Sequence, residues 1–445
     1  MSWFGLQRNT FARGIHPPAH KDTRTQAIRR LNFAPRLILP LNQHIGKPAI
    51  PIVHKHQEVV RGEPIARADG FFSVPLHAPA TGVIEKIDLM PSARGPKVMS
   101  IVLRVYSADD QTVRYGQPRD MTALSPGDMI NAIQETGMVG LGGAAFPTHA
   151  KLSVPEGHTV DTLIINGCEC EPYLTTDHRV MIEWLDELLT GIAFLRHACG
   201  ASKVIIGIED NKDDAARVIA GRIPPDSNIE VRTVRSKYPQ GSEKLLITVL
   251  TGKEVPSGGF PYDVGCVVQN TGTAALLGRL LPRTQGLIER VVTFSGPGID
   301  KPGNYLVAIG TPMDYVLDQL GFTGDAGELI LGGPMMGSAV ASLDVPITKA
   351  TSGILAMPAA TISRSVTNET HPCIHCGRCL QVCPLHLNPC QLGLLAANRE
   401  YETMQQRFHL QDCFECGSCS YICPANIPLV QYFRIAKAVL REQAG

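Results

Sequence analysis

Two short cysteine runs constrain this chain more strongly than any other feature of its sequence. "CIHCGRCLQVCP" occupies residues 373–384, and "CFECGSCSYICP" repeats the arrangement at residues 413–424, forty positions further on. In each run, intervals of two, two and three residues separate four cysteines, and proline follows the last. Eight of the 13 cysteines therefore lie within two loops, which indicates a metal-binding region.

The spacing indicates the kind of metal centre. C-x2-C-x2-C-x3-C-P is the run that binds [4Fe–4S] clusters in bacterial ferredoxins, where the fourth cysteine of each run ligates the other cluster. Zinc sites use two ligand pairs a dozen or more residues apart, and disulfides are disfavoured in a chain without a secretion signal. We therefore predict two clusters that carry electrons. Their ligands are Cys373, Cys376, Cys379 and Cys423 for cluster one, and Cys413, Cys416, Cys419 and Cys383 for cluster two.

The other five cysteines are scattered, and we interpret most of them as core or loop residues. Cys390 follows the first run in "LHLNPCQL". Its spacing from Cys383 fits neither cluster, so we interpret it as a buried thiol, with a spare ligand as the alternative.

Composition excludes several classes of function. The chain has 445 residues, enough for two to four domains, and 44% of them are hydrophobic. Basic and acidic residues balance at 41 each, so no charge pattern points to nucleic acid. The N-terminal stretch lacks the apolar core of a signal peptide, and no apolar run approaches the roughly 20 residues of a membrane-spanning helix. A position at the surface of a membrane assembly stays open.

Sequence patterns divide the chain into segments. From Leu37 to Val105, short β-like pieces are separated by glycine and proline, which predicts a small all-β module. From about Ser125 strands and amphipathic helices alternate, which predicts α/β layers around a largely parallel sheet. Short strands with one helix follow over residues 290–343, then an Ala-, Ser- and Thr-rich stretch over 351–371.

A glycine-rich stretch, "GMVGLGGAAFPTHAKL", superficially matches a dinucleotide-binding fingerprint from Gly140 through Gly142 to Ala145. The fingerprint requires a strand before it and a helix after it. Here a helical segment precedes it, and Pro147 stands where the helix should extend, so that interpretation fails. Consecutive glycines still let backbone N–H groups approach a phosphate, with Lys151 as a counter-charge.

Three further loops support a nucleotide or flavin pocket. The strand "TLIING" leads into "CECEP", which places Asn166, Glu169 and Glu171 after the carboxyl end of a strand, where α/β sheets bind ligands. "KYPQGSEKLL" and "VVQNTGTAALLGRLL" also set polar residues and glycine at element boundaries.

These motifs together resemble a known family. "GLGGAAFPT", "NGCECEP", "YPQGSEKLLITVLTGKEVPSGG" and "QNTGTA", followed by two ferredoxin runs, are similar to the C subunit of the Rnf (Rsx) electron-transport complex. The resemblance runs from "RGIHPP" at residue 13 to "CPANIPLVQYFRIAK", nearly the whole chain. The central domain is also similar to the FMN- and NADH-binding subunit of respiratory complex I.

The resemblance implies a noncovalent FMN and an NAD(H) site against it. The cofactor-binding residues that it implies are Gly140, Gly142, Gly143, Lys151, Asn166, Glu169, Glu171, Gly241, Glu243, Asn270 and Thr273, with Glu171 and Glu243 facing the nicotinamide nucleotide. The chain departs from the family pattern at two positions. Ala145 replaces a glycine, and Cys168 stands where complex I relatives have aspartate.

The resemblance also implies an α/β multidomain architecture. Its expected segments are an N-terminal arm (1–30), a lipoyl-like barrel-sandwich module (31–112), an FMN/NADH-binding α/β domain (113–287), a β-grasp module (288–345), a linker (346–370) and an α-helical two-[4Fe–4S] ferredoxin-like domain (371–445). The implied partners are a ferredoxin-like B subunit and membrane subunits. The implied location is peripheral, at the cytoplasmic face of the bacterial inner membrane.

The expected function is electron transfer between NAD(H), FMN and the two clusters, in an oxidoreductase complex that couples ferredoxin:NAD+ chemistry to ion translocation. A nicotinamide exchanges two electrons at once and each cluster takes one, so a flavin must stand between them. No acid–base or nucleophilic residue is needed. The alternatives are a related flavin and iron–sulfur reductase of the cobalamin-reductase type, and a non-catalytic iron–sulfur scaffold.

Overall fold

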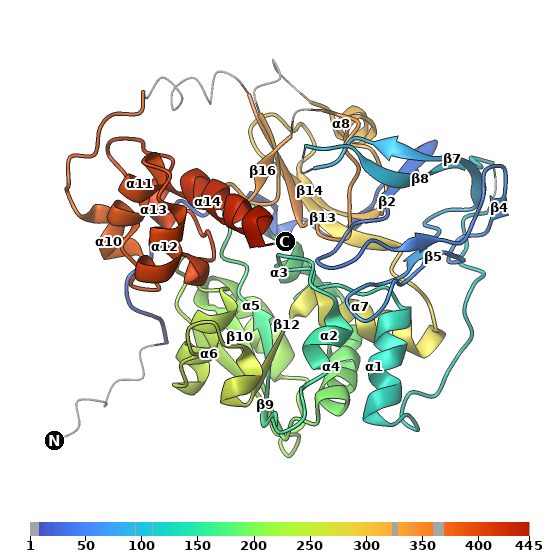
Figure 1. Ribbon diagram of the computed structural model, residues 1–445. Coiled ribbons are helices and arrows are strands. Elements are labelled where there is room, and N and C mark those ends of the chain that lie inside the picture. The colour runs from blue at the N-terminus through green and yellow to red at the C-terminus, as the bar shows by residue number, and fades with distance from the viewer. Residues whose placement is uncertain are drawn as a thin grey trace.

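The computed structural model describes residues 9–93, 95–108, 110–322, 328–340, 342–358 and 369–444. Figure 1 shows β-rich modules above a layered α/β domain, with the C-terminal helices (red) to one side. Among the described residues no helix is long and apolar enough to cross a membrane.

The predicted all-β module is confirmed. Two small sheets, ordered β2-β8-β7-β4 and β3-β5-β6, contribute residues to one hydrophobic core. Alternate residues of β2 point to opposite sides: Leu37 and Leu39 enter the main core, whereas Ile38 packs with Val102 on the other face. The strands are β2 (Arg36–Pro40), β3 (Ile50–Pro51), β4 (Glu58–Val59), β5 (Pro64–Arg67), β6 (Leu76–His77), β7 (Gly82–Met90) and β8 (Val98–Val105).

The central domain is a parallel four-stranded sheet, ordered β11-β10-β9-β12, with helices on both faces. Leu163 and Ile165 of β9 pack with α4 and α7 on one face, and Ile164 packs with α6 on the other. Its strands are β9 (Thr162–Gly167), β10 (Lys203–Glu209), β11 (Ile229–Val234) and β12 (Cys266–Asn270). Its helices are α1 (Pro126–Glu135), α2 (Thr148–Leu152), α3 (Thr176–Glu183), α4 (Leu185–Cys199), α5 (Asp213–Ala220), α6 (Glu243–Thr251) and α7 (Thr271–Leu280).

A six-stranded mixed sheet, ordered β1-β14-β13-β17-β15-β16, forms the next module, and α8 (Met313–Leu320) packs on it. Its strands are β1 (Arg29–Arg30), β13 (Glu289–Ser295), β14 (Gly303–Ala308), β15 (Glu328–Leu331), β16 (Ser338–Ala339) and β17 (Gly353–Met357). The predicted linker over residues 346–370 is wrong in its first part, because β17 lies inside the sheet between β13 and β15. "GILAM" is a buried apolar strand, while residues 359–368 lie outside the described residues.

The C-terminal domain is helical and has two similar halves. Its helices are α10 (Arg378–Val382), α11 (Pro389–Ala397), α12 (Tyr401–Phe408), α13 (Ser418–Tyr421) and α14 (Leu429–Ala444). Helices α10 and α13, and likewise α11 and α14, begin forty residues apart. Short 3-10 turns occur at Asp22–Thr25, Asp210–Lys212, Pro261–Val264, Leu281–Arg283 and Leu410–Asp412.

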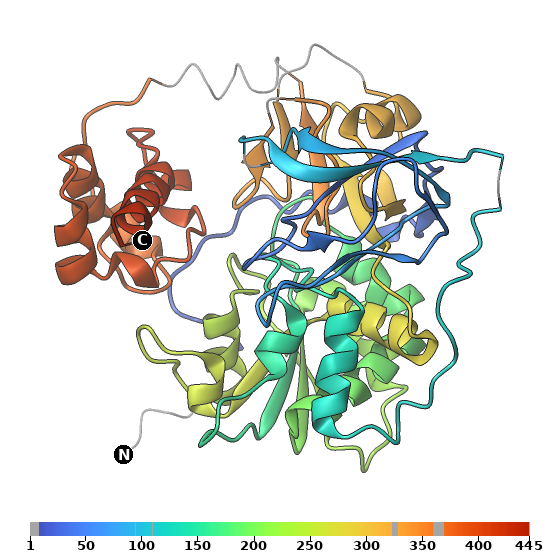
Figure 2. The ribbon, with the colours of Figure 1, turned by 45° about the vertical axis from the view of Figure 1, so that its right-hand side comes forward.

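The N-terminal segment joins this helical domain to the rest of the protein, as the blue trace beside the red helices in Figure 2 shows. Gly14 donates its N–H to Val382 O at 3.1 Å, and Ile15 pairs with Tyr238 of the central domain. Residues far apart in sequence are therefore held together where the two domains meet.

Candidate functional site

The central sheet has a topological switch point between β9 and β12. From β9 the chain continues to β10 and β11 on one side, and β12 returns on the other side. The register pairs Asn166 with Asn270, so both asparagines stand at the carboxyl edge of neighbouring strands. In open α/β sheets this crevice is where ligands bind.

The glycine loop lies against the N-terminus of α7, which starts at this edge. Leu141 N donates to Thr273 Oγ1 at 3.0 Å, and Asn270 Oδ1 caps the helix by accepting from Thr273 N at 3.1 Å. A Cβ on Gly142 would lie 2.9 Å from Asn270 Nδ2, whereas one on Gly143 would meet nothing within 4 Å. The loop is thus held against α7 on one side and is open at Gly143 on the other. Backbone N–H groups in such an open loop can bind a phosphate.

Gly140 belongs to the same loop and donates its N–H to Phe146 O at 2.9 Å. Ala145, the first departure from the family pattern, is buried with a left-handed backbone at φ 54°. Cys168, the second departure, packs into the apolar cluster under α6 and donates its thiol to Gly207 O at 3.6 Å. The loop therefore accommodates Ala145, and the Cys168 side chain lies among apolar residues.

Two predicted residues from distant loops form an ion pair beside the cradle. Lys151 Nζ on α2 lies 2.6 Å from Glu243 Oε1, the first residue of α6. Both side chains are partly exposed, at 25% and 37%. Asn166 Nδ2 donates to Gly241 O at 2.8 Å, which ties the end of β9 to the loop before α6. The structure brings these four residues together.

The other two predicted acidic residues bind backbone amides. Glu169 is buried, and its Oε1 accepts from Thr176 Oγ1 at 2.8 Å and from Asp177 N at 3.0 Å, at the start of α3. Glu171 accepts from the N–H groups of Met335 and Met336 at 3.1 and 2.8 Å. Burial raises the pKa of Glu171 to about 6. Both carboxylates therefore stabilise neighbouring backbone.

Sequence reasoning missed a buried polar layer beneath the glycine loop. Asp177 Oδ2 accepts from Asn270 Nδ2 at 2.6 Å. Burial, together with the charge of Glu169, raises the pKa of Asp177 well above its usual range. Arg290 donates to Leu141 O at 3.3 Å, and burial lowers its pKa to about 10. These partners come from segments up to 149 residues apart, so no local spacing could reveal them.

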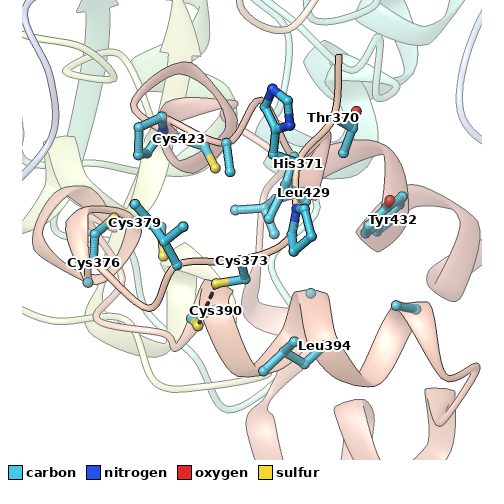
Figure 3. A pocket seen from close by; sticks show the side chains of 18 residues that line it. Thr370, His371, Cys373, Cys376, Cys379, Cys390, Leu394, Cys423, Leu429 and Tyr432 are labelled. Carbon is cyan, nitrogen blue, oxygen red and sulfur yellow. Dashed lines mark hydrogen bonds between the residues drawn. The ribbon is translucent and has the colours of Figure 1, made fainter. Parts of the chain in front are cut away.

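The cysteines predicted for cluster one surround a cavity of about 180 Å³ in the C-terminal domain. Cys373, Cys376, Cys379 and Cys423 line it, and Figure 3 shows their side chains around one space. Four thiols around a space of this kind are the donor set that a [4Fe–4S] cluster needs. Cys390 also lines this cavity, so interpreting it as a buried core thiol is wrong.

The cysteines predicted for cluster two also lie together. Burial raises the pKa of the Cys419 thiol, and the neighbouring Cys413, Cys416 and Cys383 raise it further. Cys383 comes from the first run, so both predicted groups combine cysteines of both runs.

The second group contacts the central domain directly. Tyr238 is almost fully buried, and its hydroxyl donates to Cys416 O at 2.7 Å. Ser257 Oγ donates to Asp412 Oδ2, next to Cys413, at 2.5 Å. The second group therefore lies on the side of the C-terminal domain that contacts the central domain.

Four family models match the chain. They are the RnfC barrel sandwich hybrid domain over residues 9–108, the Nuo51 FMN-binding domain over 133–279, the SLBB domain over 291–339 and the 4Fe-4S dicluster domain over 372–427. Their order along the chain is that of the four modules described above.

Curated relatives match over nearly the full length. The C subunit of the proton-translocating ferredoxin:NAD(+) oxidoreductase complex of Clostridium ljungdahlii is 41% identical, over 96% of this chain and 93% of its own. The Na(+)-translocating counterpart of Acetobacterium woodii is 40% identical, over 97% of both chains. The C subunit of the ion-translocating oxidoreductase complex of Edwardsiella ictaluri is 40% identical, but this chain spans only 54% of it.

Among solved structures, an NAD+-reducing [NiFe]-hydrogenase in the H2-reduced state is similar, with a TM-score of 0.51 and 20% identity. The match covers 71% of this chain and 63% of the hydrogenase chain. This similarity shows a shared fold.

Proposed function

Since this chain belongs to the family of C subunits of ion-translocating ferredoxin:NAD(+) oxidoreductase complexes, we propose that it passes electrons between NAD(H), a noncovalent FMN and two [4Fe–4S] clusters. Its place is peripheral, on the cytoplasmic face of the membrane, and membrane subunits of the complex carry out ion translocation. The full-length similarity to these relatives favours this function over a cobalamin-reductase type.

The residues at the switch point fit a flavin phosphate. Gly142 and Gly143 leave the cradle open, Asn270 and Thr273 hold it against α7, and Lys151 supplies a positive charge nearby. Bound FMN supplies the conversion between two-electron and one-electron transfer. The chain's own part is to hold the flavin, position the nicotinamide and place a cluster within reach.

The observation that carries the proposal is the contact between Tyr238 and Cys416, because it joins the cysteine loop that we assign to cluster two to the central domain. The cavity lined by the cysteines predicted for cluster one has its described lining in the C-terminal domain. Ile374 beside it is 67% exposed. We therefore place cluster two next to the flavin and cluster one next to the partner, a ferredoxin-like B subunit.

An anaerobic titration tests this function. The chain is purified with its clusters, FMN and iron are quantified, and NADH is added while flavin and cluster absorbance are followed. We expect one FMN and about eight iron atoms per chain, and bleaching of both signals by NADH. Iron without flavin, or no response to NADH, would support the scaffold alternative instead.

Glu243→Ala tests the nucleotide site separately. Removing this carboxylate also frees Lys151 from its ion pair at 2.6 Å. We expect weaker NADH binding, seen as a higher KM for NADH, with unchanged iron content. Lys203→Ala, which breaks an exposed ion pair between Lys203 of β10 and Glu230 of β11, is the matched control. Unchanged NADH kinetics in Glu243→Ala would contradict the assignment of this residue.

A further inference from the structure

The cavity of cluster one is lined by five thiols, one more than a cluster can use. Cys390 Sγ lies 3.7 Å from Cys373 Sγ, and Figure 3 marks this contact. His375 Nδ1 lies 4.0 Å from the same Cys390 Sγ. The donor atoms of Cys373, His375 and Cys390 all lie within 4.8 Å of one another.

The short sulfur–sulfur distance shows which position on the cluster Cys390 shares. Each iron of a [4Fe–4S] cubane takes one protein ligand, so four thiolates complete it. Two sulfur atoms in van der Waals contact face the same corner of the cavity, and only one of them can bind that iron at a time. Cys390 is therefore matched to the iron of Cys373.

The internal repeat shows that this thiol belongs to the first half alone. The residue forty positions after Cys390 is Val430, and glutamine follows both residues. Cys390 is also held firmly, because Asn388 Oδ1 caps α11 by accepting from Gln391 N at 3.0 Å. Cys373 precedes α10 and lies outside any helix.

We propose that Cys390 is an alternative ligand of cluster one, able to replace Cys373 on the same iron. The inference rests on the cluster assignment of the proposed function. In the exchange, the bond from iron to Cys373 sulfur breaks and the bond to Cys390 sulfur forms. The proton that leaves the Cys390 thiol is balanced by one taken up on Cys373, and no electron is transferred. Cluster one can thus survive the loss or modification of Cys373.

Four variants test this inference, with iron and sulfide content and the EPR spectrum of the dithionite-reduced chain as readouts. Cys373→Ala should keep the wild-type iron content of about eight atoms and both reduced-cluster signals. Cys376→Ala is the matched control, because the sulfur contact of Cys390 is with Cys373, and it should lose the signal of cluster one. Cys390→Val, which copies the second half, should keep all iron.

The double variant Cys373→Ala/Cys390→Val decides the outcome. We expect it to lose the cluster-one signal as Cys376→Ala does. Equal iron loss in Cys373→Ala and Cys376→Ala would overturn the inference. So would a double variant that retains cluster one, because solvent or buffer thiol would then be the replacing ligand. Failure of the proposed function would appear differently, as wild-type protein that lacks two clusters.

Discussion

The two halves of the C-terminal domain have the same backbone geometry but different surroundings. Residues with a left-handed backbone recur forty positions apart: His375 and Glu415, Gly377 and Gly417, His386 and Asn426. Such matching φ angles at unlike residues show that the ligating loops, and not the side chains between the cysteines, set the local conformation.

The surroundings differ on the side that faces the rest of the protein. A Cβ on Gly417 would lie 2.8 Å from Met335 O, whereas one on Gly377 would meet nothing within 4 Å. Cys416 accepts a hydrogen bond from Tyr238, while Cys376 is exposed. The cysteine motif therefore specifies the conformation of the two loops, and long-range contacts specify which loop packs against the rest of the protein.

The largest expected effect comes from removing one cluster at a time. In Cys376→Ser we expect NADH to reduce cluster two at the wild-type rate. In Cys416→Ser we expect the reduction of cluster one by NADH to slow at least roughly tenfold, the change that a barrier higher by about 1.4 kcal/mol produces, because the cluster between it and the flavin is missing. Freeze-quench EPR measures both rates, and dithionite shows that the remaining cluster is intact. The reverse pattern of rates would mean that cluster one, and not cluster two, lies next to the flavin.

Replacing the fourth cysteine of each run by serine tests the crossed ligation. Cys383→Ser should remove the EPR signal of cluster two, although Cys383 belongs to the first run, because it lies with the cysteines of the second run. Cys423→Ser should remove that of cluster one, whose cavity it lines. The spectra of Cys376→Ser and Cys416→Ser assign the signals. If each variant lost the cluster of its own run, the ligation would not be crossed.

A matched glycine pair measures the contact that distinguishes the halves. Alanine at either Gly377 or Gly417 introduces left-handed strain of about 1–2 kcal/mol. Only Gly417→Ala also pushes a methyl group against Met335 O, which adds about 1–3 kcal/mol of overpacking. We expect Gly417→Ala to lose cluster absorbance at a lower urea concentration than Gly377→Ala. Equal urea midpoints would mean that the turn at Met335 moves away from the added methyl group without loss of stability.

Glu171 makes this same turn sensitive to pH. Its buried carboxyl binds the N–H groups of Met335 and Met336, and burial raises its pKa from 4.5 to about 6. Because the folded-state pKa is the higher one, folding takes up a proton in this interval, and the associated stability is present below about pH 4.5 and lost as pH rises through about 6. A shift of this size is worth about 2 kcal/mol.

Glu171→Gln should remove that part of the pH dependence. Urea unfolding at a series of pH values between about 5 and about 7.5 would show a flatter stability profile than wild type. Glu243→Gln, a partly exposed carboxyl, is the matched control. A Glu171→Gln profile parallel to that of wild type would show that another group titrates in this range.

Local patterns in the sequence predicted much of this molecule. The two cysteine loops, the strands of the parallel sheet and the glycine loop could be predicted from spacing and periodicity, because each of these segments depends on residues close in sequence. The interactions of Glu171 with Met335, 164 positions away, could not follow from spacing. The strand Gly353–Met357 was missed for a related reason: its partners are strands β13 and β15, and its flanks are rich in small residues.

The smallest expected effect comes from exchanging side chains at a pair of repeated positions that share one backbone conformation. His386 and Asn426 share a left-handed conformation, at φ 56° and 53°. Asparagine adopts this region more readily than most other residues, so importing it as His386→Asn should stabilise the first half by up to about 0.5 kcal/mol, a fraction of the usual left-handed penalty. The reverse change, Asn426→His, should destabilise the second half by a similar amount. Urea midpoints of cluster loss measure both changes. Effects of the same sign would show that contacts of these side chains outweigh the backbone geometry that the two halves share.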